Sequence, residues 1–134
     1  NAPADIQQKA KEYAAKNNVP ESIAMGMLSK ESGGVNGLTS SAGASGLLQL
    51  MPGTARGLGV TDVMNVDQNL DAGYRYADQM YNKYGDWGQA LAAYNWGPGN
   101  MDAYLKTGYG LKGQSMPNET INYVNGIMGT KVYG

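Results

Sequence analysis

The chain has 134 residues with a formal net charge of -1, and it contains 20 Gly, 10 Tyr and 8 Met but no His, Cys or Phe. The missing His and Cys exclude imidazole bases, thiolate nucleophiles, disulfides and the metal sites built on these side chains. The balanced charge argues against a nucleic-acid surface and against an anionic membrane surface, since both need clustered positive charge. If the chain is an enzyme, a carboxylate is the expected catalytic group, and we expect neither a metal nor a cofactor.

The hydrophobic periodicity is helical almost throughout, and strand signals are scarce. In chain order, we expect helices at about residues 5–16, 20–32, 54–58, 65–84, 86–95, 101–106 and 118–128. Asp5, Asp86 and Asn118 are suited to cap the N-termini of three of them. Residues 33–46 are rich in Gly, Ser, Thr and Asn and are expected to form a loop.

These features predict a mostly α domain of about six to eight helices, with Gly-rich loops and at most a rudimentary strand region. Residues 1–134 are enough for one hydrophobic core, so we expect a single domain. No apolar stretch approaches the roughly 20 residues that span a bilayer. The opening residues lack the basic and apolar segments of a signal peptide, and we expect any targeting to lie elsewhere.

One carboxylate falls on an apolar helix face. In the expected helix 20–32 the apolar residues are Ile23, Ala24, Met27 and Leu28. Glu31 follows Met27 by four residues and Leu28 by three, so it shares their face. Burial there and the last turn of the helix would both raise the pKa of its carboxyl group. A protonated Glu beside two glycines suits a general acid. The alternative is that Glu31 points outward and is solvated.

Four segments carry a family resemblance. They are Glu31-Ser32, Gly43-Ala-Ser-Gly-Leu-Leu-Gln-Leu-Met-Pro-Gly-Thr-Ala55, Ala93-Tyr-Asn-Trp-Gly-Pro-Gly99 and Glu119-Thr-Ile-Asn-Tyr-Val124. Together they resemble the catalytic domain of soluble lytic transglycosylases, lysozyme-like enzymes that cleave peptidoglycan. The resemblance is strongest over residues 20–128, and the order and spacing of the four segments make it specific.

The resemblance implies a lysozyme-like α domain that cleaves the MurNAc-β-1,4-GlcNAc bond. A single Glu would protonate the bridging oxygen and then take a proton from the muramic acid C6 hydroxyl, which closes a 1,6-anhydro ring. Ordinary glycoside hydrolysis uses two carboxylates. Asp62, Asp67 and Asp71 look like loop and cap residues, so one catalytic Glu suits this sequence.

The resemblance also implies roles for residues of the first half of the chain. Glu31 matches the catalytic position. Ser40 and Gln49 match polar groups that line the cleft near the scissile bond. Met51 matches an apolar residue of the sugar-binding floor, although packing alone would also explain it.

In the second half, Tyr94 and Asn95 match a segment whose Tyr hydroxyl reaches toward the catalytic Glu and whose Asn supports that wall. Glu119 matches a group facing the stem peptide, and Tyr123 one facing the sugar. Both tyrosines could instead be core residues. Trp96 replaces a small residue of the family, and it could extend the sugar platform or cover the core.

Two other functions remain open. A hydrolase of the goose-type lysozyme kind would share the fold and the Glu but deliver water, and a catalytically silent module would only bind glycan. We expect peptidoglycan glycan strands and stem peptides as partners, with no nucleic acid and no membrane span, and a monomer as an isolated domain. The expected location is the cell envelope or periplasm, the secreted fraction or a virion.

A calcium-like alternation is a weaker signal. Asn65, Asp67, Asn69 and Asp71 alternate as in a calcium loop. However, Leu70 stands where that loop needs Gly, and Tyr76 where it needs Glu. We therefore expect no metal at this segment.

Overall fold

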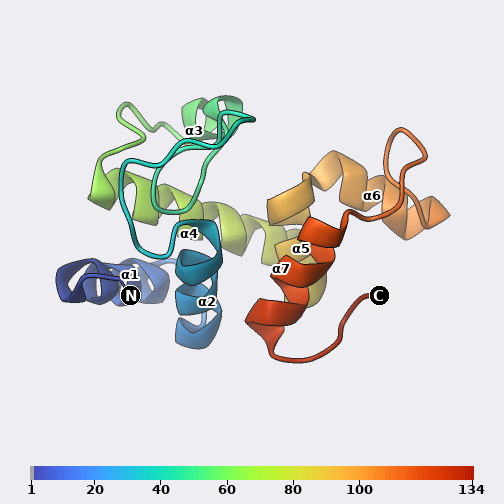
Figure 1. The fold of residues 1–134 in the computed structure, drawn as a ribbon, viewed down its shortest axis with the longest axis horizontal. Helices are drawn as coiled ribbons and strands as arrows, with labels where there is room; N and C mark the ends of the chain where they lie inside the picture. The colour runs from blue at the N-terminus through green and yellow to red at the C-terminus, as the bar shows by residue number, and fades with distance from the viewer. Residues whose placement is uncertain (1) are drawn as a thin grey trace. The chain divides into compact units, whose positions relative to one another are not determined.

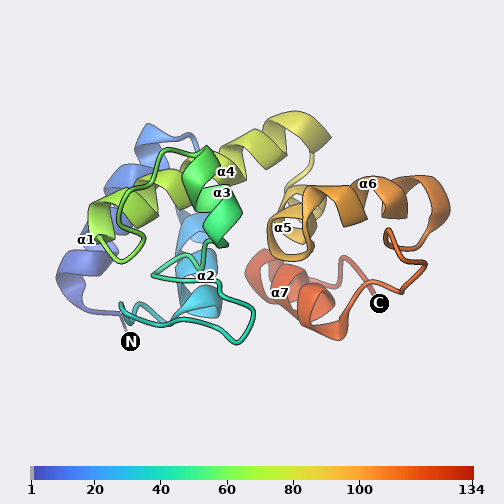
Figure 2. The same ribbon diagram turned by 90° about the horizontal axis from the view of Figure 1, so that it is seen from above.

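The computed structural model describes residues 2–134, which form seven α-helices (Figures 1 and 2). They are α1 (Ala4–Lys16), α2 (Glu21–Glu31), α3 (Pro52–Gly57), α4 (Val66–Tyr84), α5 (Trp87–Trp96), α6 (Pro98–Thr107) and α7 (Asn118–Met128). Outside the helices, two isolated bridges pair Ser45 with Thr39 and with Leu50. The predicted mostly α class with a rudimentary strand region is confirmed. No helix within residues 2–134 is long and apolar enough to cross a membrane.

The chain divides into two compact units, residues 1–78 and 79–134, and the boundary falls within α4. In the first unit α1 packs against α2. The predicted apolar face of α2 is confirmed, because its buried residues are Ile23, Ala24, Met27 and Leu28. Tyr74 of α4 is fully buried, and its hydroxyl donates to the Ala24 carbonyl at 2.8 Å. This bond ties α4 to α2, and burial raises the pKa of Tyr74.

The apolar strip 47–50 lies against α4. Leu47, Leu48 and Leu50 are each at most 2% exposed. A Cβ atom added at Gly73 of α4 would lie 2.8 Å from Cβ of Leu48. The glycine therefore allows the strip to approach the helix backbone closely.

In the second unit α5 packs against both α6 and α7. Its core includes Leu91, Met101 and Val124, all with no exposed surface. The rings of Tyr81 and Trp87 stack with their centroids 4.7 Å apart. This contact joins the last turns of α4 to the start of α5 within residues 79–134.

Two predicted helix caps are wrong. Asp5 and Asn118 lie inside the first turns of α1 and α7, and the residues before these helices are Pro3 and Pro117. Proline has its φ angle already set near the helical value, so the chain turns into each helix without a side-chain cap. The predicted cap at Asp86 is confirmed, because its carboxylate accepts from the Gln89 N–H at 2.9 Å.

Two helices also begin earlier than predicted. α3 starts at Pro52 and α6 at Pro98, rather than near residues 54 and 101. Proline is favoured in the first turn, where its missing N–H would have no partner within the helix. The break before α6 is a single residue, Gly97, with φ near +99°.

Candidate active site

Glu31 is the last residue of α2 and is half-buried. The helix ends directly after it, because the N–H of Gly33 donates to the carbonyls of Leu28 and Ser29 at 3.1 and 3.0 Å. Gly33 has a φ of +65°, a left-handed conformation that glycine adopts without strain. Glu31 therefore lies at the C-terminal end of α2, next to a glycine turn. Its half-burial is intermediate between the two alternatives for this side chain, burial on the apolar face and full exposure to solvent.

The loop after Glu31 contains a tight turn. Ser45 and Leu50 exchange two backbone hydrogen bonds of 3.0 Å each, and residues 46–49 form the turn between them. Gln49 has a φ of +50°. Its amide nitrogen Nε2 donates to the carbonyls of Leu38 and Gly46 at 3.1 and 2.9 Å. The Gln49 side chain is thus held in a defined orientation on a half-exposed part of the loop.

Ser40 and Met51 lie in the same unit as Glu31 and Gln49. Ser40 is exposed, and its Oγ accepts from the Ala44 N–H at 3.0 Å, which closes a turn of the loop. Met51 precedes α3 and is 44% exposed. Packing in the core therefore does not account for Met51. An exposed apolar side chain near an oriented amide is suited to contact a sugar ring.

The other four predicted site residues lie in the second unit, on α5 and α7. Tyr94 and Asn95 occupy the last turn of α5, both half-buried. The buried Thr120 donates from its hydroxyl to Oδ1 of Asn95 at 2.7 Å, which joins α7 to α5. Glu119 is exposed in the first turn of α7, whereas Tyr123 is only 5% exposed. The burial of Tyr123 favours a core role for that ring.

Trp96 packs within the second unit. Its indole meets the Tyr104 ring edge to face at a centroid distance of 6.0 Å. A Cβ atom at Gly110 would lie 2.6 Å from the same indole. These contacts favour the covering role for Trp96 over an extended sugar platform.

Three aspartates of the first unit have structural partners. Asp67 accepts from the Lys9 ammonium at 3.1 Å and from the Tyr13 hydroxyl at 2.9 Å. These two bonds lower the pKa of Asp67. Asp71 forms an ion pair with Lys16 at 3.4 Å, and Asp62 accepts from a loop N–H at 3.0 Å. No group of three or more His, Cys, Asp or Glu in residues 2–134 is placed to hold a metal.

Asn69 is a further residue beside the loop of the predicted site that the sequence did not single out. In the sequence it belongs to the calcium-like alternation, yet its side chain is fully buried and accepts from the Leu48 N–H of the strip 47–50. A usable signal was present, because Gly73 follows Asn69 by one helical turn on the same face. A glycine inside a helix indicates close approach of another part of the chain.

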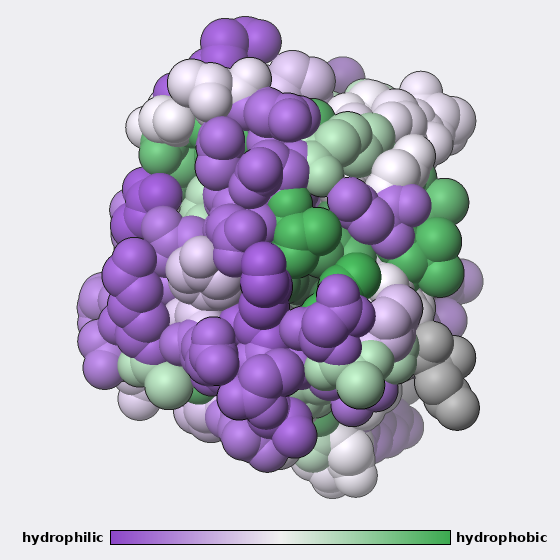
Figure 3. All heavy atoms as spheres, turned by 90° about the vertical axis from the view of Figure 1, so that its left-hand side faces the viewer, coloured by the Kyte–Doolittle hydropathy of each residue, from purple (hydrophilic) through white to green (hydrophobic). Residues whose placement is uncertain are grey.

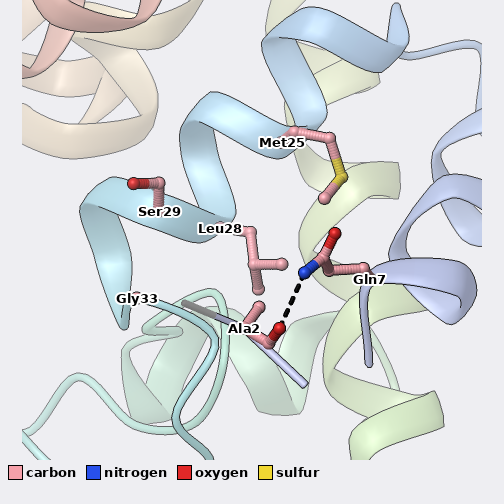
Figure 4. A pocket seen from close by; sticks show the side chains of 6 residues that line it. All are labelled: Ala2, Gln7, Met25, Leu28, Ser29 and Gly33. Carbon is pink, nitrogen blue, oxygen red and sulfur yellow. Dashed lines mark hydrogen bonds between the residues drawn. The ribbon is translucent and has the colours of Figure 1, made fainter. Parts of the chain in front are cut away.

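A pocket of about 350 Å³ lies beside α2, lined by Ala2, Gln7, Met25, Leu28, Ser29 and Gly33 (Figure 4). The Gln7 amide nitrogen donates to the Ala2 carbonyl at 2.7 Å across one side of it. None of these six residues is a carboxylic acid. The pocket is therefore not where the carboxylate chemistry is expected.

Two solved structures with a similar fold are lytic transglycosylases. The lytic transglycosylase Slt of Pseudomonas aeruginosa, solved as an inactive Glu-to-Gln mutant, is 28% identical with a TM-score of 0.76 over 90% of this chain and 22% of that chain. The 70-kDa soluble lytic transglycosylase of Escherichia coli is 25% identical with a TM-score of 0.69, over 92% and 24% of the two chains. The fold therefore places the chain in the class of lytic transglycosylase domains.

The family model of the transglycosylase SLT domain matches residues 8–117, and the chain belongs to this family. Among curated relatives, the transglycosylase of Enterobacteria phage PRD1 is 34% identical over 87% of this chain and 42% of the relative. The soluble lytic murein transglycosylase of Escherichia coli K12 is 29% identical over 92% and 22%. The chain therefore spans less than half of the length of these relatives. Glu119 and Tyr123 lie beyond the matched residues.

Proposed function

We propose that this chain is the catalytic domain of a peptidoglycan lytic transglycosylase, with Glu31 as the general acid and then the general base. The reaction would cleave the MurNAc-β-1,4-GlcNAc bond and leave a 1,6-anhydro-MurNAc end. The observation that supports it most is the position of Glu31, half-buried at the end of α2 inside the matched SLT domain. A solved relative is described as inactive with a Glu replaced by Gln, which supports a glutamate as the essential group.

The proposed reaction balances with one carboxyl group. The protonated Glu31 gives its proton to the bridging oxygen as the bond from C1 of MurNAc to that oxygen breaks. The carboxylate then takes the proton of the C6 hydroxyl while the C6 oxygen bonds to C1. Glu31 ends protonated, no water is consumed, and the second carboxylate of ordinary hydrolysis is not needed. The structural bonds of Asp62, Asp67 and Asp71 agree with this economy.

Substrate contacts are proposed for the residues that the resemblance named. Gln49 would present its oriented amide to the sugar near the scissile bond, and Met51 would supply an apolar floor. Ser40 would line the same part of the loop. A 70-kDa soluble lytic transglycosylase has been solved in complex with bulgecin A, which supports a ligand site in this family.

On the second unit, Tyr94 would contact the substrate, and Asn95 would hold this part of α5 against α7 through its bond to Thr120. The exposed Glu119 would face the stem peptide. Tyr123 would face the sugar with only a small part of its ring, given its burial.

We further propose that the domain acts on the cell wall as a monomer. The named relatives include murein transglycosylases and a phage transglycosylase, which supports action in the bacterial envelope or from a virion. With a net charge of -1, the protein gains little electrostatic attraction to an anionic wall, so affinity would come from specific contacts.

Digestion of purified sacculi tests the proposal. The unsubstituted protein is expected to release anhydro-muropeptides, which mass spectrometry finds lighter by one water than reducing muropeptides. Glu31→Gln removes the proton that the leaving oxygen needs, so turnover should fall by at least about 100-fold. Glu21→Gln is the matched control, because Glu21 makes the same charge change at the exposed start of α2, and it should keep its activity.

Three results would contradict the proposal. Reducing ends alone would indicate a hydrolase of the goose-type lysozyme kind. Binding of glycan strands without turnover would indicate a silent glycan-binding module. Full activity in Glu31→Gln would remove Glu31 from the catalytic role.

A further inference from the structure

The residues that surround the turn 46–49 meet on one side chain of α4. Asn69 has no exposed surface, although it is polar. Its Oδ1 accepts from the Leu48 N–H at 2.8 Å. Its Nδ2 donates to the Ser45 carbonyl at 3.1 Å and to the Val63 carbonyl at 2.9 Å. One amide thus pairs three backbone groups that come from two different loops.

These three bonds have a large combined effect because the site is buried. A backbone polar group that loses its partner away from water is strongly destabilising, so the turn and the amide depend on each other. No aspartate could replace the asparagine at neutral pH, since a carboxylate oxygen would face the carbonyls of Ser45 and Val63. Leucine, of similar size, would remove all three of these hydrogen bonds.

The backbone of the turn has formed around this amide. Gly46 has a φ of +81°, and a Cβ atom there would collide with Nδ2 of Asn69 and lie 2.6 Å from the Val63 carbonyl oxygen. Three residues later Gln49 also takes a left-handed conformation, with a φ of +50°. For a residue other than glycine this conformation is unfavourable and persists only where the surroundings impose it.

We propose that Asn69 is a positioning residue that holds the turn 46–49, and through it the amide of Gln49, in the orientation that substrate needs. The proposal rests on the role of Gln49 under the proposed function. Asn69 does not itself reach the substrate, since it is fully buried beneath the turn. Its effect is transmitted by the Leu48 N–H, directly before Gln49, and by Ser45, where the turn begins.

The test replaces Asn69 and measures peptidoglycan cleavage at a temperature where circular dichroism shows each variant folded. Asn69→Ala removes all three bonds, and Asn69→Asp keeps the size and the Oδ1 acceptor but removes the donor. Because small misplacements of binding groups are costly, both should lower kcat/KM roughly 10- to 100-fold. Asn65→Asp is the control: Asn65 caps the same helix through its Oδ1, and Asp caps equally well, so activity should be unchanged.

A double substitution separates positioning from general weakening. If Asn69 acts through Gln49, then Asn69→Ala combined with Gln49→Ala should lower kcat/KM no further than the worse single variant. Multiplied effects would overturn the proposal. A folded Asn69→Ala variant with natural kcat/KM would also overturn it.

Amide hydrogen exchange tests whether Asn69 holds the turn 46–49, and it does not require an activity measurement. The Leu48 N–H should be protected in the natural protein and exchange at least about tenfold faster in a folded Asn69 variant. A Leu48 amide that exchanges as fast as exposed loop amides in the natural protein would overturn the proposal, whether or not the variants fold. If instead the natural protein fails to cleave peptidoglycan while the Leu48 N–H is protected, the proposed function is contradicted, whereas the bonding of the turn by Asn69 is supported.

Discussion

Gly46 and Gly73 of the first unit, like Gly34, have neighbours that leave no room for a methyl group. Gly46 lies against the buried amide of Asn69, and Gly73 against Leu48. Gly46 has positive φ, but Gly73 lies inside a helix, where glycine is normally unfavourable by about 1 kcal/mol relative to alanine. The close approach of the strip to the helix explains its presence there.

At the residue scale, Gly73→Ala should lower the free energy of unfolding by about 1–2 kcal/mol. The gain in helix propensity is outweighed by the cost of overpacking against Leu48. The contact includes the Cβ atom of Leu48, which a change of side-chain rotamer does not move. Gly53→Ala is the matched control, since Gly53 lies in a helix with no atom near its added Cβ. Urea unfolding should show Gly53→Ala unchanged or slightly more stable. Equal stability of Gly73→Ala and the natural protein would contradict the overpacking.

At the scale of the elements, the helix ends are set by two different devices. Prolines precede α1, α2 and α7 or open α3 and α6, so most starts rely on backbone geometry. α5 instead relies on the Asp86 carboxylate. The residues next to a helix start therefore contribute unequally to stability, according to whether their side chain bonds a free N–H.

Asp86→Ala should lower the free energy of unfolding by about 1 kcal/mol, because the Gln89 N–H loses its acceptor. Asp5→Ala removes the same charged group from a first turn without a capping bond, so only a few tenths of a kcal/mol from the helix dipole should be lost. Urea titrations of both variants provide the comparison. A larger loss for Asp5→Ala than for Asp86→Ala would show that charge, rather than capping, determines these helix starts.

At the scale of the whole molecule, each compact unit carries an ion pair that also involves a tyrosine. In the first, Asp67 is held by Lys9 and Tyr13; in the second, the Lys83 ammonium lies 2.8 Å from Asp102, which also accepts from a tyrosine hydroxyl. The surface that faces the viewer in Figure 3 is mostly hydrophilic with a smaller apolar area. The prediction of a single domain stays a prediction.

These pairs predict an acid-sensitive stability. Hydrogen bonds from the partner lysines, followed by those from the tyrosines, lower the pKa of both Asp67 and Asp102. Their stabilisation is therefore present above the unfolded pKa near 3.9 and is lost as pH falls through the lower folded pKa values. Asp67→Asn and Asp102→Asn should each make the fall in stability below about pH 4 shallower, as measured by urea midpoints.

High salt should weaken the effect of both substitutions, because the pairs are solvent-exposed. If the fall in stability below about pH 4 were unchanged in both variants, the two ion pairs would not be its cause. A shared unfolding transition that responds to both substitutions would support the single domain, whereas separate responses would indicate that the two units unfold independently.

The sequence alone predicted the helical class and about six to eight helices, since a 3.6-residue period and Gly or Pro boundaries are local signals. It predicted that Glu31 shares the apolar face of its helix, and the family resemblance named the loop residues Gln49 and Met51. The helix starts were predicted least accurately, because a proline and an acidic or amide side chain can each mark the start of a helix.

Only the tertiary structure decided which polar residues support the loop. Asn69 bonds Leu48 from 21 residues away, and Trp96 packs against Tyr104 and lies close to Gly110. Neither partner is visible in a local pattern, because the contact exists only after separate segments have packed. A buried amide between two loops is recognised by the backbone groups that it bonds. Almost every residue has the same backbone N–H and C=O groups, so the sequence does not show which of them will be bonded.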